Sequence, residues 1–295
     1  MPDNKDDSGF VLALGGGGGR GLAHLGVLQA LEEHDLVPSA IIGTSIGALL
    51  GSMYAINPDI MKMREQVYSF LESKVFNELD LPRLIEADTA DHTWLGKLTA
   101  AARETVLYAR STTENALVNT QKIREIFGTL LENKTFDELQ IPLHVTTVRF
   151  PSGEIEIFSS GDLVGPVTAS TAIPGIFEPV QIAGQSYVDG GLACELPAKE
   201  AKMVSKSGQI VVAVDVGARP RADARPDTVI GMLDWAMRIK SLYLRQYKSE
   251  FADVLIQPIP GFRQWSDFTH PDHEIERGHQ SALEHIPRIV ALLNR

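Results

Sequence analysis

The sequence predicts an α/β fold in which a mainly parallel central sheet is flanked by helices. Apolar segments of strand length alternate along the chain with segments of helical apolar periodicity, a pattern typical of βαβ units around a parallel sheet. Two of the apolar segments also run directly into glycine-rich turns that precede a helix, at residues 15–19 and 43–47. Such turns are where open α/β sheets place their functional groups.

The apolar pattern places the individual elements. Residues 10–14 form an expected buried strand, and the helix after Arg20 has leucines at helical spacing, with Gly21 and Gly26 small enough for close packing. The other expected strands are 40–42, 141–150, 154–159, 186–189, 209–216 with the apolar run 210–214 inside it, and 254–256. Residues 151–153 are expected as the turn between two of them. Further helices are expected over 48–56 and 229–247.

Three segments are less regular. Residues 71–111 mix leucines, Trp94, Tyr108 and charges without one period, which indicates an inserted helical region of packing helices or, alternatively, a lid. Residues 219–227 indicate a solvated loop. The apolar side of the helix 229–247 is predicted to be a core face rather than a dimer or membrane surface; it consists of Ile230, Leu233, Met237 and Leu244.

The organisation is predicted to be simple. No internal repeat and no linker divides the chain, so residues 10–295 are expected to form a single domain after a flexible N-terminus, residues 1–9. With 295 residues, 44% of them hydrophobic and 22% charged, an ordinary globular core is expected.

Charge excludes some partners. The net charge of -11 and a pI near 5.2 argue against a nucleic-acid partner, because phosphate binding needs clustered Lys and Arg. The same acidity disfavours lasting electrostatic attachment to anionic lipid, while transient membrane-surface contact through an apolar patch stays open, as does a homo-oligomer.

The protein is expected to be soluble and cytoplasmic. Cys194 is the one cysteine, which rules out an internal disulfide, and no Cys/His spacing indicates a metal site. The first ten residues hold three Asp and one Lys, unlike a signal peptide. No uninterrupted apolar stretch reaches the ~18 residues that a membrane-spanning helix needs.

The sequence Gly43-Thr44-Ser45-Ile46-Gly47 is a G-x-S-x-G motif between a strand and a helix. Small residues around Ser45 permit the sharp turn that exposes its hydroxyl, and the N-terminus of the next helix favours negative charge there. The motif therefore indicates a serine nucleophile rather than a plain tight turn.

The sequence from Gly15 to Gly21 holds five consecutive glycines, Arg20 and a final glycine. Backbone amides at this glycine density can converge on an anion. A Walker A phosphate loop is disfavoured because Gly-Lys-Ser/Thr is missing. A dinucleotide site matches G-x-G-x-x-G at Gly16, Gly18 and Gly21, but the acidic partner would have to come from the solvated helix end around Glu32, Glu33 and Asp35. An oxyanion hole beside a serine is the more economical interpretation.

A third motif, Tyr187-Val-Asp189-Gly190-Gly191, places an Asp at a strand end before two glycines. Taken alone it indicates no more than a turn, since Asp-Gly is a common turn dipeptide.

Together, the glycine loop, G-x-S-x-G and D-G-G resemble the motifs of the patatin-like phospholipases, in the same order. Residues 169–180, ASTAIPGIFEPV, resemble the segment that precedes the Asp in that family, and residues 153–161 resemble the strand before it in bacterial members. The resemblance covers roughly residues 10–216, about two thirds of the chain. One departure is Glu195, before Leu196 and Pro197, where many relatives have Asn; it puts the hydrogen bonding near Asp189 in question.

The resemblance implies an α/β/α sandwich and a serine hydrolase acting on lipid acyl esters through an acyl-enzyme. Ser45 would be the nucleophile and Asp189 the base of a Ser–Asp dyad. The implied oxyanion hole consists of the amides of Gly17, Gly18 and Gly19, and the implied supporting residues are Gly16, Arg20, Gly21, Gly43, Gly47, Gly190 and Gly191. No metal or organic cofactor is implied.

Other functions stay open on the sequence. A Ser–Asp–His triad of the α/β-hydrolase type would draw its base from His270, His273, His279 or His285, although these indicate surface or helix residues, and His24 indicates a packed helix residue. Acyl transfer would use the same acyl-enzyme with another nucleophile. A non-catalytic binding or regulatory protein would keep the glycine loop for a phosphate or nucleotide.

Overall fold

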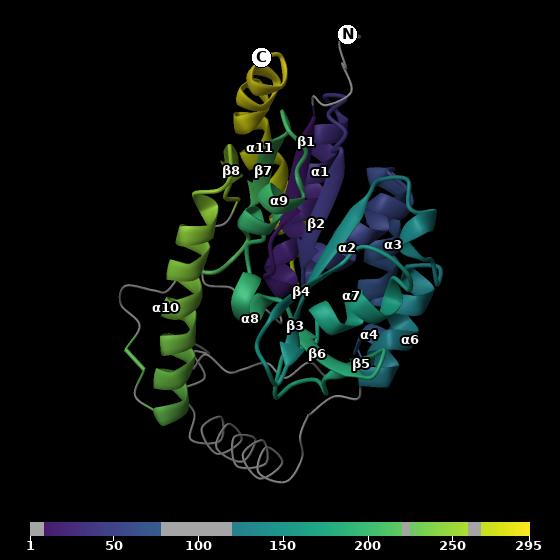
Figure 1. The fold of residues 1–295 in the computed structure, drawn as a ribbon, viewed down its shortest axis with the longest axis vertical. Helices are drawn as coiled ribbons and strands as arrows, with labels where there is room; N and C mark the ends of the chain where they lie inside the picture. The colour runs from purple at the N-terminus through teal and green to yellow at the C-terminus, as the bar shows by residue number, and fades with distance from the viewer. Residues whose placement is uncertain (1–8, 78–119, 220–224, 227, 259–266) are drawn as a thin grey trace.

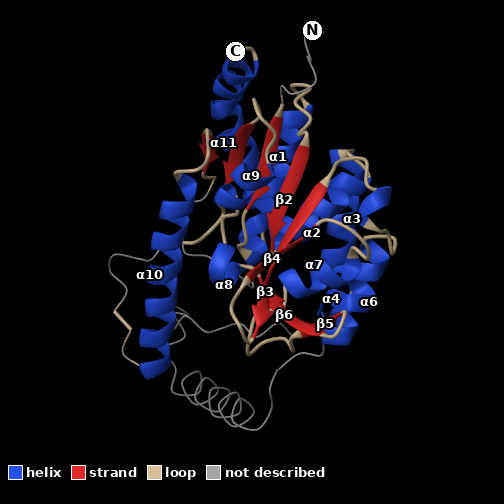
Figure 2. Ribbon diagram, in the orientation of Figure 1, coloured by secondary structure: helices blue, strands red, loops and turns tan. Residues whose placement is uncertain are grey.

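One eight-stranded sheet runs through the molecule, and helices cover both of its faces (Figures 1 and 2). The computed structural model describes residues 9–77, 120–219, 225–226, 228–258 and 267–295. The strand order is β5-β6-β3-β2-β1-β7-β8, with β4 paired to β3 outside this path. The predicted α/β class is confirmed.

The sheet is mainly parallel, as predicted. The strands are β1 (Phe10–Leu14), β2 (Ala40–Thr44), β3 (Leu143–Phe150), β4 (Ile155–Phe158), β5 (Val180–Ile182), β6 (Gln185–Asp189), β7 (Ile210–Val214) and β8 (Val254–Ile256). Strands β3, β2, β1, β7 and β8 run parallel to one another, whereas β4 and β6 pair antiparallel with β3, and β5 pairs antiparallel with β6. The parallel strands end at one edge, which gathers the motif-bearing turns there.

The helices fill the connections between strands. The α-helices are α1 (Ala23–Glu32), α2 (Ile46–Ile56), α3 (Ile60–Glu72), α4 (Lys74–Asn77), α6 (Thr120–Leu130), α7 (Val164–Ser170), α8 (Gly191–Cys194), α9 (Ala198–Val204), α10 (Val229–Ser249) and α11 (Pro271–Leu293). Two 3-10 helices, Gly18–Leu22 and Phe136–Glu138, complete the described elements.

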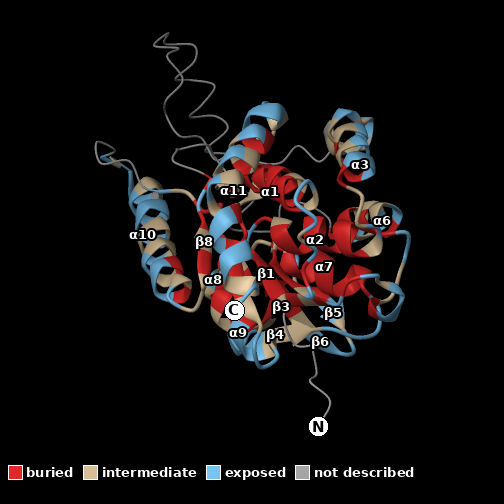
Figure 3. Ribbon diagram, turned by 90° about the horizontal axis from the view of Figure 1, so that it is seen from above, coloured by how far each residue is buried: buried red, intermediate tan, exposed pale blue. Residues whose placement is uncertain are grey.

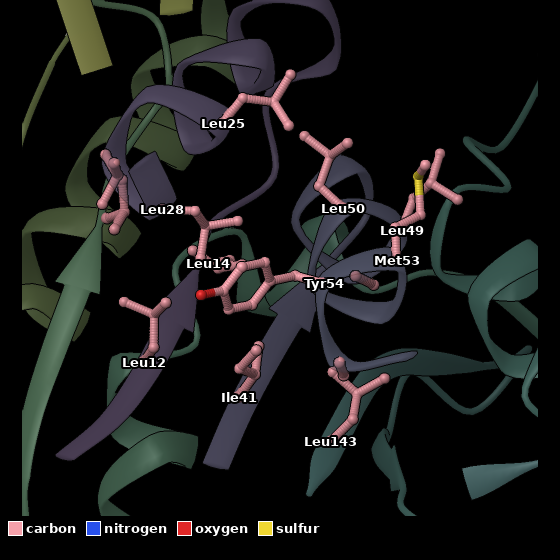
Figure 4. Close-up of a cluster of buried hydrophobic side chains, with 14 of the residues drawn as sticks. Leu12, Leu14, Leu25, Leu28, Ile41, Leu49, Leu50, Met53, Tyr54 and Leu143 are labelled. Atoms are coloured by element: carbon pink, nitrogen blue, oxygen red, sulfur yellow. The ribbon is translucent and has the colours of Figure 1, made fainter. Parts of the chain in front are cut away.

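Alternating side chains of the strands build two cores. Leu12 and Leu14 of β1 point to the larger core with the leucines of α1 and α2, as Figure 4 shows. Val11 and Ala13 point to the opposite face, where Ala198 of α9 packs on the sheet. The buried residues concentrate on the sheet and on the helices α1, α2 and α7, whereas α10 is largely exposed (Figure 3). Burial on both faces explains why the central strands are continuous apolar runs.

Helices α1 and α11 cross at two glycines. A Cβ atom on Gly26 would lie 1.8 Å from the carbonyl oxygen of Ile275, and one on Gly278 would lie 1.9 Å from that of Ala23. The expectation that Gly26 allows close packing is confirmed. The contact fixes the C-terminal helix against the helix that follows the glycine loop.

The predicted strands and helices are observed with small shifts in their ends. β2 extends two residues beyond the predicted 40–42, and β5 was not expected, because three residues are too few to show a period. The inserted region predicted over 71–111 lies outside the described residues except for 71–77, at the end of α3 and in α4. Most of the 219–227 loop and nearly all of the N-terminal segment 1–9 also lie outside them. A single domain stays a prediction.

The core face predicted on α10 is wrong at Leu233 and Met237, which are 63% and 55% exposed, whereas Leu244 is half-buried. Val229, Met232 and Trp235 are exposed as well. Apolar periodicity shows that a helix has an apolar side, but not that another element covers it. No helix in the described part of the chain has both the length and the apolarity to cross a bilayer.

The α1–α11 crossing makes a prediction about stability. Gly278→Ala should lower the free energy of unfolding by about 2 kcal/mol, because a backbone overlap outweighs the ~1 kcal/mol gained in helix propensity. Chemical denaturation would measure it, with Gln280→Ala on the exposed side of α11 as control, expected within ~0.5 kcal/mol of the parent. A Gly278→Ala variant as stable as the parent would show that the helices can separate freely.

Candidate active site

Ser45 stands on a sharp turn between β2 and α2. Its backbone has φ 55° and ψ -122°, a left-handed conformation that is strained for a residue with a side chain. Two glycines make the turn sterically feasible. A Cβ on Gly43 would lie 2.5 Å from the Cα of Ala48, and one on Gly47 would lie 2.3 Å from the carbonyl oxygen of Leu14. The sharp strand-to-helix turn predicted for this motif is therefore present.

Ser170 holds the turn from the other side. The Ser45 amide donates to the Ser170 Oγ at 2.8 Å, and that hydroxyl donates to the Thr146 carbonyl at 2.7 Å. The sequence analysis assigned Ser170 no role beyond membership of the segment 169–180. In the sequence, a serine on a short apolar helix cannot be distinguished from an ordinary packing residue.

Asp189 lies at the end of β6, beside Ser45. The Ser45 Oγ donates to the Asp189 Oδ2 at 2.9 Å, and the Gly191 amide donates to the Asp189 Oδ1 at 2.6 Å. The antiparallel pairing of β6 with β3 sets this approach, since Thr147 is opposite Asp189 and β3 is the neighbour of β2. Residues 144 positions apart thus meet where β2 and β6 end.

Gly190 allows the chain to turn away directly after the carboxylate. A Cβ on Gly190 would lie 2.5 Å from the Thr146 carbonyl oxygen. Glu195, the departure noted in the sequence, does not displace either partner of Asp189: its backbone oxygen accepts from Gly16 and its carboxylate faces α10.

Burial changes the acidity of Asp189. Desolvation raises its pKa to about 7, and the nearby negative charge of Glu195 acts in the same direction. Hydrogen bonds from Gly191 and Ser45 oppose the shift. A carboxylate with a pKa near neutrality is a far better proton acceptor than an exposed Asp.

The glycine loop packs against the serine. Its first two amides are used for support: Gly15 donates to the Val214 carbonyl at 3.0 Å and Gly16 to the Glu195 carbonyl at 2.8 Å. A Cβ on Gly16 would lie 3.3 Å from the Ser45 Cβ. Gly17 is the N-cap residue of the 3-10 helix Gly18–Leu22, and Gly18 and Gly19 begin that helix. The first amides of such a helix have no acceptor within it.

Two buried side chains support this loop. The Arg20 Nε donates to the Val216 carbonyl at 3.1 Å, and burial lowers the Arg20 pKa to about 10. The His24 Nε2 donates to the Gly15 carbonyl at 2.8 Å, and burial lowers the His24 pKa to about 4, which keeps the ring neutral at pH 7. Gly21 leaves room for Ile46, because a Cβ added at Gly21 would lie 2.2 Å from the Ile46 Cγ2.

The histidines of the triad hypothesis lie elsewhere. His279 is hydrogen-bonded to Glu33 at 2.7 Å, and His285 donates to the Ser281 carbonyl at 2.8 Å. His270 and His273 lie at the N-terminal end of α11. Within the described residues, the Asp189 carboxylate is hydrogen-bonded to Ser45 and Gly191, and to no histidine.

Comparisons with known proteins agree on one family. The family model of the patatin-like phospholipases matches residues 12–202. The lysophospholipase NTE1 of Kluyveromyces lactis is 31% identical over 207 residues, 70% of this chain and 12% of that protein. An uncharacterized NTE family protein of Mycobacterium bovis is 29% identical over 234 residues, 78% of this chain and 56% of that protein. The chain therefore spans only a small part of the lysophospholipases that it matches.

Among solved structures, VipD of Legionella pneumophila aligns with 98% of this chain and 67% of its own, at 16% identity and a TM-score of 0.47.

The raised Asp189 pKa predicts a pH-dependent stability. A carboxyl group whose pKa is higher in the folded state makes its full contribution to folding stability below its unfolded pKa of ~3.8. That contribution is lost as the pH rises to about 7. The unfolding free energy of Asp189→Asn minus that of the parent should therefore increase by roughly 2–3 kcal/mol from pH 5 to pH 8.

Denaturant titrations at both pH values would measure this gain. Asp59→Asn is the control, because Asp59 is a helix cap whose amide contacts lower its pKa, so its effect should not change over this range. An Asp189→Asn effect that is equal at both pH values would contradict the raised pKa.

Proposed function

This chain belongs to the patatin-like phospholipase family, and we therefore propose that it is a serine lipid acyl hydrolase that uses Ser45 and Asp189 as a catalytic dyad. The observation that carries the proposal is the 2.9 Å hydrogen bond from the Ser45 Oγ to the Asp189 Oδ2, on a strained turn beside the glycine loop. Nucleophile and base within hydrogen-bond reach are the geometry that covalent catalysis requires.

In the first half-reaction, the Ser45 Oγ attacks the ester carbonyl and its proton passes to Asp189. The carbonyl oxygen becomes an oxyanion, which the amides of Gly17, Gly18 and Gly19 would bind, and the N-terminus of α2 favours the negative charge. The tetrahedral intermediate then collapses. Its C–O bond to the leaving alcohol breaks, Asp189 returns the proton to that oxygen, and Ser45 carries the acyl group.

The second half-reaction uses water in place of the alcohol. Asp189 takes a proton from water as the water oxygen attacks the acyl carbon, and the new oxyanion occupies the same glycine loop. The bond to the Ser45 Oγ then breaks, the serine regains its proton, and the fatty acid leaves. An alcohol or lysolipid in place of water would make the same acyl-enzyme a transferase, so the two outcomes share every residue of the site.

Lysophospholipid is the substrate class to test first, because relatives with 29–31% identity carry the name lysophospholipase. Phospholipids and simple carboxylic esters present the same acyl carbonyl to Ser45. A contact with a lipid surface would occur while the substrate is being extracted, since the acidic chain favours no lasting attachment to anionic lipid.

A fluorophosphonate probe tests the dyad. The parent should be labelled and should hydrolyse a short-chain chromogenic ester and a lysophospholipid. Ser45→Ala should lose labelling, and Asp189→Asn should lose ~10³-fold or more in turnover, because no base remains to accept the serine proton.

His279→Ala is the matched control, since His279 lies in the C-terminal region that the triad hypothesis requires. It should keep most activity. A ~10³-fold loss at His279, or labelling that survives Ser45→Ala, would contradict the dyad. Nucleotide binding that persists in Ser45→Ala, in a parent that is never labelled, would instead favour a binding protein.

A further inference from the structure

A cluster of buried charges lies beneath the glycine loop. The Arg245 guanidinium of α10 donates from Nη1 to the Asp215 Oδ1 at 2.6 Å and from Nη2 to the Ala218 carbonyl at 2.6 Å. Its Nε lies 3.5 Å from the Glu195 Oε2. The Arg245 side chain is 3% exposed, and those of Asp215 and Glu195 are 9% and 17% exposed. Charges this far from water keep a fixed geometry only when they are paired.

The partners of Arg245 are also the supports of the glycine loop. The Glu195 backbone oxygen accepts the Gly16 amide, and the carbonyl of Val214, the residue before Asp215, accepts the Gly15 amide. Asp215 in turn accepts the Gly217 amide at 3.0 Å, which fixes the chain just after β7.

The segment after β7 is in direct contact with the proposed oxyanion donors. A Cβ on Gly17 would lie 2.8 Å from the Val216 Cγ2 and 2.9 Å from the Val216 carbonyl oxygen, so the loop rests on this residue without a gap. The Arg20 Nε holds the same carbonyl. Any shift of residues 214–217 must therefore move the glycine loop. Oxyanion donors are effective only within about 2.7–3.1 Å of the oxygen that they bind.

We propose that Arg245 is a positioning residue for the glycine loop, acting through Glu195 and Asp215. This inference rests on the proposed oxyanion role of that loop. An arginine suits the position because its planar fork reaches two carboxylates and one carbonyl at once, which the single ammonium of a lysine cannot do. Gly217 leaves the space, since a Cβ there would lie 1.9 Å from the Arg245 Nη1.

The loop geometry consequently depends on where α10 lies. Ser241, one turn before Arg245, also donates its hydroxyl to the Glu195 carboxylate, so two residues on one side of this helix hold Glu195. The same helix offers an internal comparison. Lys248 forms an equally buried ion pair with Glu200, each side chain 6% exposed, but Glu200 belongs to α9 and does not support the loop.

The test compares Arg245→Met with Lys248→Met, which each remove one buried cation from α10. Both variants are assayed below their unfolding temperatures on a soluble short-chain ester. Their affinity for a trifluoromethyl ketone is also measured, because this compound adds to a serine and places an oxyanion in the proposed oxyanion hole. Arg245→Met should lower kcat about 10- to 100-fold, with KM changed less than about threefold. It should also weaken binding of the trifluoromethyl ketone by a factor similar to the loss in kcat. Lys248→Met should keep kcat and ketone affinity within about twofold.

Two further variants keep the test decisive. Arg245→Lys should restore part of the lost kcat, and Glu195→Gln, which is isosteric, should lose about tenfold in kcat even if Arg245→Met fails to fold. Equal losses in Arg245→Met and Lys248→Met, or an unchanged kcat and ketone affinity in Glu195→Gln, would overturn the positioning role while the parent stays active. A parent that shows neither turnover nor labelling of Ser45 would overturn the proposed function and the positioning role together.

Discussion

The hydrogen bond between the Ser45 hydroxyl and the Asp189 carboxylate is the interaction on which the rest of the site depends. Ser45 follows β2 and Asp189 ends β6, two strands that are separated in the sheet by β3 alone. The 2.9 Å contact therefore requires that the parallel pairing of β2 with β3 and the antiparallel pairing of β6 with β3 both hold their register. A slip of one residue in either pairing would turn one of the two side chains to the opposite face. The sheet thus brings together the two residues, distant in sequence, that form the proposed dyad.

Crowding and burial where β2 and β6 end explain why the site contains several glycines and a buried carboxylate that lowers folding stability. Gly43, Gly47 and Gly190 each stand where a Cβ would lie within 2.5 Å of the backbone. Burial raises the pKa of Asp189 toward neutrality, which costs folding stability at the pH where the carboxylate is a useful base. Exclusion of water by a bound substrate would also strengthen hydrogen bonds to a developing oxyanion. The same condition that destabilises the resting site favours the chemistry proposed for it.

Local patterns in the sequence predicted the parallel strands, the turn of Ser45 and the two glycine-flanked motifs, because each depends on residues close together in the chain. The pairing of the motifs came from resemblance to a family and not from periodicity. What the sequence could not predict are contacts between distant segments: Ser170 supports the Ser45 amide 125 positions away, and Arg245 reaches Asp215 and Glu195 across 30 and 50 positions. The exposed side of α10 was missed for a related reason, since its apolar residues carry no signal of what lies next to them.

The most direct test of the central claim is the pH dependence of acylation. The rate constant for labelling of Ser45 by a fluorophosphonate would be measured from pH 5 to pH 9. Because only the ionised carboxylate accepts a proton, and burial places the Asp189 pKa at about 7, the rate should rise about tenfold per pH unit below that value and level off above it. A rate that is already level at pH 5, as expected for a carboxylate with an ordinary pKa near 4, would contradict a buried Asp189 acting as the base for Ser45.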